Sequence, residues 1–163
     1  LVPTYRLSAA LADGINILSL HEELIKTIPQ NSILTPHIGE FERLVGKCAS
    51  HNERLEKLVE FSTANSLIIV LKGAYTAIAT PAGKIYFNST GNPGMATGGS
   101  GDVLTGILTG LLAQKYLPEN AAKVGVFLHG LAGDLAAIDI SQQALIADDI
   151  IDYIPKAYKC LLK

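Results

Sequence analysis

Cysteine is scarce in this chain of 163 residues, which contains only two, Cys48 and Cys160. They lie far apart, and no Cys-x-x-Cys pair or other metal-binding spacing occurs. The sequence therefore offers no disulfide framework and no metal site built on cysteine. Such usage is typical of a reducing compartment, and we expect a cytoplasmic location and no dedicated metal ligands.

Charge is also scarce, because charged residues make up 17% of the chain and the net charge is -2. No cluster of lysine and arginine occurs, which argues against a nucleic-acid partner, since such a protein needs a basic patch. The longest apolar runs, such as residues 67–71, are of strand length and fall short of the roughly twenty residues of a membrane helix. No signal peptide is evident. We expect neither nucleic acid nor membrane as a partner.

Apolar side chains are abundant, at 48% of the chain, and with this length they predict one domain with a substantial core. We expect strands at residues 32–35 and 67–71, a hairpin over residues 76–87, and helices at residues 18–28, 39–45, 53–64, 102–114, 120–138 and 150–162. This alternation predicts an α/β fold, a three-layer α/β/α sandwich with a mainly parallel central sheet.

The most informative stretch is residues 92–108, where Gly98, Gly99 and Gly101 come just before Asp102 and a strongly apolar run. This order predicts a glycine loop that leads into a helix. Glycine adopts backbone angles closed to other residues, so successive N–H groups can point at one place, and the helix adds unpaired N–H groups and its positive dipole end. We expect an anion such as a phosphate to bind there.

Asp102 has two expected roles at this junction. It can serve as the N-cap of the helix, and a carboxylate beside a bound phosphate can remove a proton from a hydroxyl that attacks phosphorus. The plainer interpretation is an ordinary turn before a helix. The stretch is neither a dinucleotide fingerprint nor a Walker A loop, so the residues alone indicate an anion site beside a carboxylate and no more.

The stretch resembles a known family. MATGGSGDVL at residues 95–104 is similar to the signature of the C-terminal domain of YjeF-type proteins, the NAD(P)H-hydrate dehydratases of the ribokinase-like superfamily. Two further segments match the family in the same order, LTPHIGEF at residues 34–41 and VLKGAYT at residues 70–76. The resemblance covers about residues 13–134 and implies a ribokinase-like fold.

The resemblance also implies a reaction, the dehydration of hydrated NADH and NADPH through phosphorylation of the added hydroxyl by ADP or ATP and loss of that phosphate. Asp102 would be the catalytic base and a substrate contact, with Gly99 and Gly101 as catalytic parts of an anion hole that includes Gly98. The nucleotide would bind at these three glycines and at Lys72, Gly73, Ala74, Tyr75 and Thr76. Mg²⁺ is expected with the phosphates, although no cation site is visible.

The substrate contacts implied by the resemblance are His37, Asp13 and Asn16, together with Asp102. His37 follows a predicted strand, where sites of open α/β sheets lie, although without the family match it would be taken for a cap or a surface residue. Asp13 is either a substrate contact or a turn residue, because Leu11 stands where the family usually has an Asp. Lys72 could equally be a structural lysine without the motif.

Four further polar residues are expected to be structural. Glu40 and Glu42 are taken for caps or solvated charges, and His129 and Asp134 for structural residues of the second apolar helix.

The first residue is not methionine, and the resemblance implies that family members carry a further segment before this point. We therefore expect residues 1–163 to be one ribokinase-like domain that is the C-terminal fragment of a larger one, with a homo-oligomer and a fused epimerase domain left open. Two alternatives remain for the function: a ribokinase-like kinase of a small hydroxylated metabolite such as a vitamin precursor, and a non-catalytic nucleotide-binding module.

Overall fold

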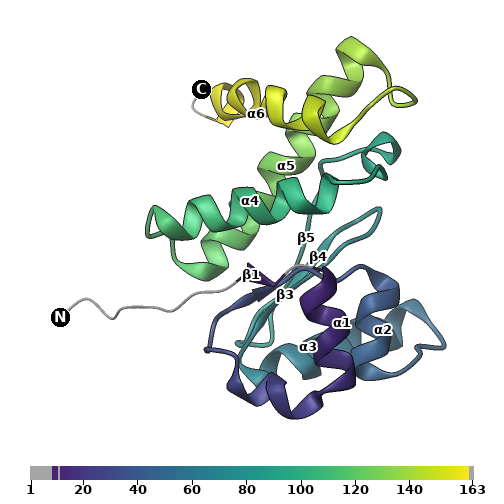
Figure 1. Ribbon diagram of the computed structural model, residues 1–163, viewed down its shortest axis with the longest axis vertical. Coiled ribbons are helices and arrows are strands. Elements are labelled where there is room, and N and C mark those ends of the chain that lie inside the picture. Colours follow the sequence, from purple (N-terminus) through teal and green to yellow (C-terminus); the bar gives the residue numbers. More distant parts are fainter. Residues whose placement is uncertain (1–8, 11, 162–163) are drawn as a thin grey trace.

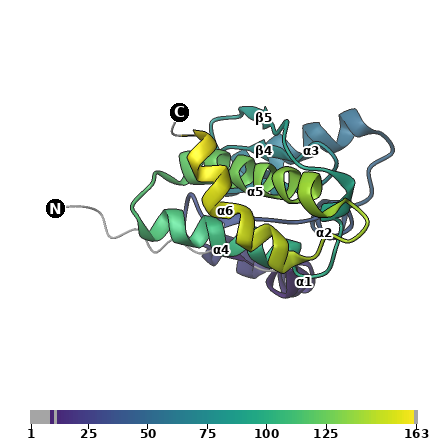
Figure 2. The ribbon, with the colours of Figure 1, turned by 90° about the horizontal axis from the view of Figure 1, so that it is seen from above.

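The computed structural model describes the backbone of residues 9–10 and 12–161 and the side chains of residues 14–161. Figure 1 shows a sheet between two groups of helices. Helices α1 (Ala12–Leu20), α2 (Ile38–Val45) and α3 (His51–Asn65) lie on one face, and α4 (Ser100–Ala113) and α5 (Pro118–Ile140) lie on the other. Helix α6 (Ala147–Leu161) lies over α4 and α5 (Figure 2). The expected α/β sandwich is confirmed.

The sheet is mixed, which corrects the expectation of a mainly parallel one. Its strands are β1 (Ala9–Ala10), β2 (Ile33–Leu34), β3 (Ile68–Leu71), β4 (Ala77–Ala79) and β5 (Ile85–Phe87), in that spatial order. The pairings β1–β2 and β2–β3 are parallel, whereas β3–β4 and β4–β5 are antiparallel. The connections after β3 and β4 are too short for a crossover, so both reverse the chain direction. The predicted hairpin over residues 76–87 is confirmed.

Strand β3 is buried at all four positions, as its continuous apolar run predicts. Because side chains alternate across a strand, Ile69 and Leu71 join the core beneath α1 and α3, whereas Ile68 and Val70 join the core beneath α4 and α5. The sheet is thus covered by apolar side chains on both faces. Polar residues are confined to its ends, where the loops begin.

Two helix predictions need correction. The helix expected over residues 18–28 is two elements, since α1 ends at Leu20 and a 3₁₀ helix η1 (Glu22–Thr27) follows His21. His21 has φ -135° and ψ 69°, which interrupts the helix and lets η1 turn Ile25 into the core. Helix α6 begins at Ala147 rather than Ile150 and passes through Pro155.

Helix α5 is long and apolar enough to span a membrane by length and composition. More than half of its apolar window, 56%, is buried inside the protein, where it packs between the sheet and α6. The central helix of a folded core has the same composition. The apolar character of α5 is therefore accounted for by packing.

Candidate active site

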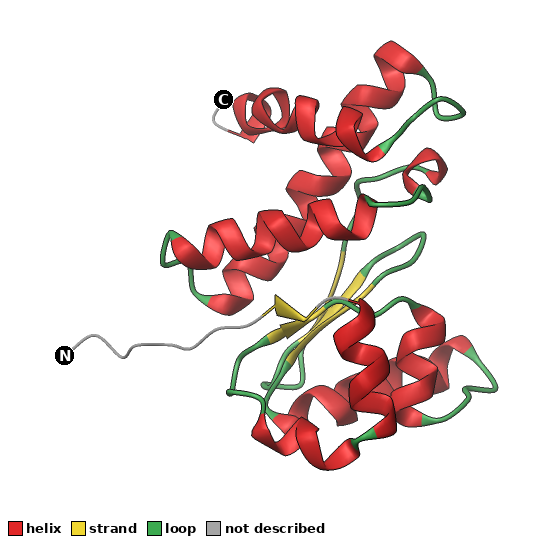
Figure 3. Cartoon of the chain, viewed as in Figure 1, coloured by secondary structure: helices red, strands yellow, loops and turns green. Residues whose placement is uncertain are grey.

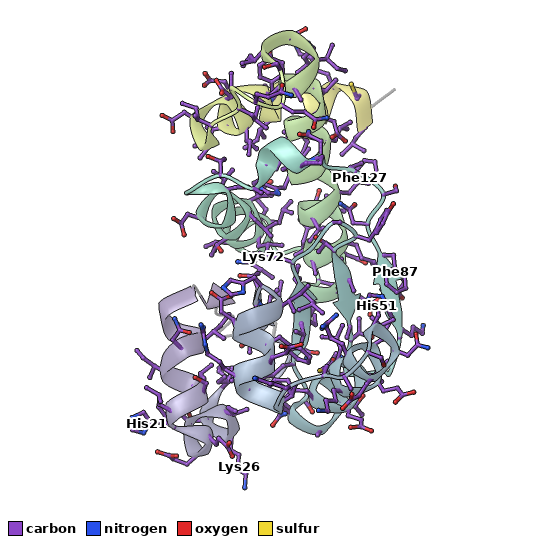
Figure 4. All side chains as sticks on the ribbon, turned by 90° about the vertical axis from the view of Figure 1, so that its right-hand side faces the viewer. His21, Lys26, His51, Lys72, Phe87 and Phe127 are labelled. Carbon is purple, nitrogen blue, oxygen red and sulfur yellow. The ribbon has the colours of Figure 1, made fainter. Side chains whose placement is uncertain are left out.

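The site is built where strands β2 and β3 end. Lys72, the residue after β3, donates its backbone N–H to the carbonyl of Pro36 at 2.8 Å, and His37 and Lys72 form a parallel bridge that extends the ladder. His37 and Lys72 therefore leave the sheet side by side at its carboxyl end, as expected for an open α/β sheet. Figure 3 shows the loop after β3 and the segment that leads into α4 on this same side of the sheet, and Figure 4 shows Lys72 between α4 and the helices of the opposite layer.

The glycine loop does lead into a helix, α4, but its N-cap is Gly99 and not Asp102. Gly99 has φ 86° and ψ -17°, left-handed angles that glycine adopts without strain. Its carbonyl accepts from the amides of Asp102 and Val103 at 2.9 and 3.1 Å. Asp102 is thus the third helical residue, exposed in the first turn, where its carboxylate still faces the positive end of the helix dipole.

The amino end of α4 has unpaired donors. Among the described residues, the backbone N–H groups of Gly98, Gly99 and Gly101 have no hydrogen-bond partner. The Lys72 ammonium lies beside the last of these, since a Cβ placed on Gly101 would be 3.3 Å from Lys72 Nζ. No described carboxylate lies within 4 Å of that ammonium. Unpaired amides and an unpaired cation converge at a helix N-terminus, which is the arrangement that binds phosphate.

A cavity of about 650 Å³, here named the loop cavity, opens at this point. None of the side chains that line it is acidic, and it takes in residues of the β3–β4 loop, the segment before α4 and helix α5. Of the predicted nucleotide residues, it brings together Lys72, Gly73, Ala74, Thr76 and Gly101. Tyr75, Gly98 and Gly99 are not part of its lining, and Tyr75 is 78% exposed.

A second cavity of about 610 Å³, the helix cavity, lies on the other side of the amino end of α4, between α4 and α6. Asp102 and Asp148 are the acidic residues of its lining, and most of its other side chains are apolar. The first turn of α4 therefore separates a loop cavity without acidic groups from a helix cavity with two carboxylates. His37 lines the loop cavity, so the two predicted substrate contacts His37 and Asp102 do not share one cavity.

His37 is both a cap and a cavity residue. It is the N-cap of α2: its Nδ1 accepts from the Glu40 amide at 3.2 Å, while Glu40 Oε2 accepts from the His37 amide at 2.7 Å. His37 Nε2 lies 3.1 Å from Glu40 Oε1, and the Glu40 side chain is 4% exposed. This capping box confirms the cap interpretation of Glu40. A buried carboxylate thus holds the imidazole in place while half of His37 remains exposed.

The other two predicted substrate contacts lie on α1. Asn16 Oδ1 accepts from Arg43 Nη1 of α2 at 2.8 Å, and Asn16 lines neither cavity. Asp13 is in the first turn of α1, but its side chain lies outside the described residues. The structure therefore does not bring Asn16 to the cavities, and the role of Asp13 stays a prediction.

No group of three or more His, Cys, Asp or Glu side chains that could hold a metal ion occurs among the described residues. Both cysteines are free. Hard cations such as Mg²⁺ prefer several oxygens around one point, and the part of the chain that the structure describes has no such group of three or more side chains.

His129 lines the loop cavity from α5, which sequence reasoning missed because it took this residue for a purely structural one. Its Nε2 lies 3.0 Å from the carbonyl oxygen of Ser100 and 3.4 Å from Ser100 Oγ. Burial lowers the pKa of His129 to about 4, and the Lys72 charge acts in the same direction. The ring is therefore neutral at pH 7. The available signal was HGLAGD at residues 129–134, in which each polar residue is paired with a glycine four positions away, His129 with Gly133 and Asp134 with Gly130.

Comparison with known proteins agrees with the three sequence segments. The family model described as NAD(P)H-hydrate dehydratase matches residues 11–156. The bifunctional NAD(P)H-hydrate repair enzyme Nnr of Moorella thermoacetica is 44% identical over 158 residues, which are 95% of this chain and 30% of that protein.

Among solved structures, the ADP/ATP-dependent NAD(P)H-hydrate dehydratase of Bacillus subtilis, co-crystallised with ATP and Mg²⁺, is 38% identical with a TM-score of 0.73, covering 81% of this chain and 48% of that one. A ribokinase-like superfamily protein of Enterococcus faecalis is 31% identical with a TM-score of 0.73, covering 90% of this chain and 50% of that one. The chain thus spans from about a third to half the length of these proteins. It has a ribokinase-like fold and belongs to the NAD(P)H-hydrate dehydratase family.

Proposed function

We propose that this protein dehydrates hydrated NADH and NADPH with ADP or ATP as the phosphoryl donor. The observation that carries the proposal is the position of the first turn of α4, which has the unpaired Gly101 amide and Lys72 on one side and the Asp102 carboxylate on the other. Phosphoryl transfer needs an anion site and a base next to each other. The family of the chain and the name of its Bacillus subtilis relative support the same reaction.

The nucleotide binds in the loop cavity in this proposal. Its terminal phosphate accepts hydrogen bonds from the Gly101 amide and the Lys72 ammonium, which lie together at the cavity wall. The absence of acidic groups from the described lining leaves the nucleotide charge without repulsion there. A volume of about 650 Å³ is within the ordinary range for small-molecule sites.

The hydroxyl of the hydrate approaches from the helix cavity, where Asp102 is exposed. The carboxylate takes the hydroxyl proton, the oxygen forms a bond to phosphorus, and the bond from phosphorus to the departing nucleotide oxygen breaks. The phosphorylated hydrate then loses phosphate, which carries away the former hydroxyl oxygen and the electron pair of the C–O bond. The adjacent carbon gives up a proton to the departing phosphate or to water, and the electron pair of that C–H bond restores the double bond. The amides at the amino end of α4 stabilise the charge on the transferred group.

Mg²⁺ is expected to enter with the nucleotide, held by phosphate oxygens and water, which is how this ion commonly binds in phosphoryl-transfer sites. It would neutralise charge on the phosphates. The described residues offer no cluster of ligands for it, so the protein's share of the chemistry is the amides, Lys72 and Asp102.

The proposal extends to three features of the whole protein. The Moorella relative is named a bifunctional repair enzyme, which supports an epimerase activity fused upstream. A homo-oligomer and a cytoplasmic location are further proposals, for which the apolar helices and the cysteine usage are the only support.

The test uses the full-length gene product with hydrated NADPH, Mg²⁺ and either ADP or ATP, and follows the return of NADPH absorbance. The variant Asp102→Asn should bind ADP normally and lose about 10²–10⁴-fold in turnover, because the base is gone while the amides remain. Asp148→Asn is the matched control, since Asp148 lines the same cavity from α6, and it should retain near-normal turnover.

Near-normal turnover of Asp102→Asn would exclude Asp102 as the base. Nucleotide binding by the wild-type protein without recovery of NADPH would favour the small-alcohol kinase or the non-catalytic module.

A further inference from the structure

One face of α5 contacts the segment that leads into α4 at its beginning, its middle and its end. Residues 129, 130, 133 and 134 share this face, since positions four apart in a helix are neighbours. They are His129, Gly130, Gly133 and Asp134. The segment they contact, residues 88–100, forms one wall of the loop cavity. Figure 4 labels Phe127 on α5 beside this segment, and the Phe127 carbonyl accepts from Thr90 Oγ1 at 2.9 Å.

Asp134 holds the beginning of the segment. Its Oδ2 accepts from the Gly91 amide at 2.8 Å, and its Oδ1 accepts from Asn92 Nδ2 at 3.0 Å. Asn92 Oδ1 in turn accepts from the Gly94 amide at 3.0 Å. Gly91 has φ 102°, a left-handed turn that only glycine adopts freely. The Asp134 carboxylate therefore holds the chain where it turns.

The two glycines of this face allow the segment to lie directly on the helix. A Cβ on Gly130 would be 2.7 Å from the backbone carbon of Thr90, and a Cβ on Gly133 would overlap the Met95 side chain. A side chain at Gly130 would therefore push the segment outward, whereas one at Gly133 would displace the Met95 side chain. The contact between α5 and the segment is thus backbone against backbone at Gly130.

His129 holds the end of the segment, at the first residue of α4. A carbonyl oxygen can only accept, so the 3.0 Å contact with Ser100 requires that Nε2 of His129 carry the hydrogen. Ser100 is 7% exposed and lies between Gly99 and Gly101. The bond therefore fixes the Ser100–Gly101 peptide, which carries the unpaired Gly101 amide and follows the left-handed Gly99 by one residue.

We propose that His129 and Asp134 are positioning residues, which hold the segment of residues 88–100 against α5 so that the amides at the amino end of α4 converge on the anion. The proposal rests on the proposed function for its ligand, a nucleoside diphosphate or triphosphate. Neither side chain need touch the nucleotide for this role. Anion binding by several amides depends on their common direction, so a rotation of the Ser100 peptide weakens it.

The test compares His129→Leu, which removes the donor, with His129→Gln, whose Nε2 can replace it. Ser62→Ala is the matched control, because Ser62 Oγ donates to the Leu67 carbonyl at 2.6 Å and is also buried, but lies in the opposite layer. For each protein, titration calorimetry measures the affinity for ADP and for adenosine, which lacks phosphate. Hydrogen exchange measures the protection of amides at residues 96–104 and at residues 51–65.

We expect His129→Leu to bind ADP about tenfold more weakly, the effect of one lost hydrogen bond, with its affinity for adenosine unchanged. Protection should fall at residues 96–104 and not at residues 51–65. His129→Gln should recover most of the ADP affinity and most of the protection at residues 96–104. Ser62→Ala should lower the thermal midpoint of unfolding without changing the affinity for ADP. Asp134→Asn should lower protection at residues 88–95.

Wild-type ADP affinity and unchanged protection at residues 96–104 in a folded His129→Leu protein would overturn the proposal, as would equal losses for ADP and adenosine. If the wild-type protein bound no ADP, the proposed function would fail, while the hydrogen-exchange comparison would still decide whether His129 positions the segment.

Discussion

The N-cap of α4 makes a sharp prediction about two adjacent glycines. Gly99 has φ 86°, and a Cβ placed on it would lie 3.1 Å from the Cβ of Ala147 in α6. Gly98, its neighbour, is outside the positive-φ region, and a Cβ there would meet no atom within 4 Å. The variants Gly99→Ala and Gly98→Ala are therefore a matched pair. The chemical change is the same, but only at Gly99 do the backbone angles and the neighbouring atoms disfavour a side chain.

The free energy of unfolding should separate the two variants. A non-glycine residue in the left-handed region costs about 1–2 kcal/mol, and the close contact with Ala147 adds to it, so we expect Gly99→Ala to lose roughly 2 kcal/mol or more. The free energy of unfolding of Gly98→Ala should equal that of the wild type or exceed it by up to about 1 kcal/mol, because alanine has less backbone freedom than glycine in the unfolded chain.

Urea unfolding followed by circular dichroism measures both free energies, with the slope against urea checked for each variant. ADP titration should also show weaker binding for Gly99→Ala, since the strained N-cap shifts the amides that follow it. Equal midpoints for the two variants would refute the reasoning, because they would mean that the left-handed geometry of Gly99 is not required to start α4.

Two further predictions concern His129 and Gly101. Burial lowers the pKa of His129 from 6.5 to about 4, so the unfolded chain binds a proton more readily than the folded protein does. The contribution of neutral His129 to the free energy of unfolding is therefore fully present above about pH 6.5. It falls by about 3 kcal/mol as the pH drops to 4. In urea unfolding from pH 7 to 4, the difference in stability between the wild type and His129→Gln should shrink accordingly, and a constant difference would contradict the assignment. Gly101→Val should weaken ADP binding about tenfold, because the new Cβ comes within 3.3 Å of Lys72 Nζ and displaces the ammonium, and unchanged affinity in calorimetry would remove Gly101 from the anion site.

The local elements could be predicted because their signals are local. The run at residues 67–71 became β3, and residues 76–87 became the hairpin of β4 and β5. The glycine loop was placed correctly before α4, but its N-cap was assigned to Asp102 instead of Gly99. Both residue types cap helices well, and the hydrogen bonds from the Asp102 and Val103 amides to the Gly99 carbonyl decide between them.

The candidate site was predictable in part. The strand ends placed His37 and Lys72 together, as expected from a rule that holds for the whole fold class. The predicted set of substrate contacts does not share one cavity, because His37 and Asp102 line cavities on opposite sides of the first turn of α4. Sequence spacing carries no information about which side of a helix end a distant loop will occupy.

By itself the sequence determined the fold class, the glycine loop and the family, because hydrophobic periodicity, glycine spacing and motif order are properties of adjacent residues. Only the tertiary structure decided that α5 supports the loop. His129 forms a hydrogen bond with Ser100, and Asp134 forms one with Gly91, although these pairs are 29 and 43 residues apart in the sequence. Contacts of that range depend on how helices pack against the sheet, and packing is set by the whole core.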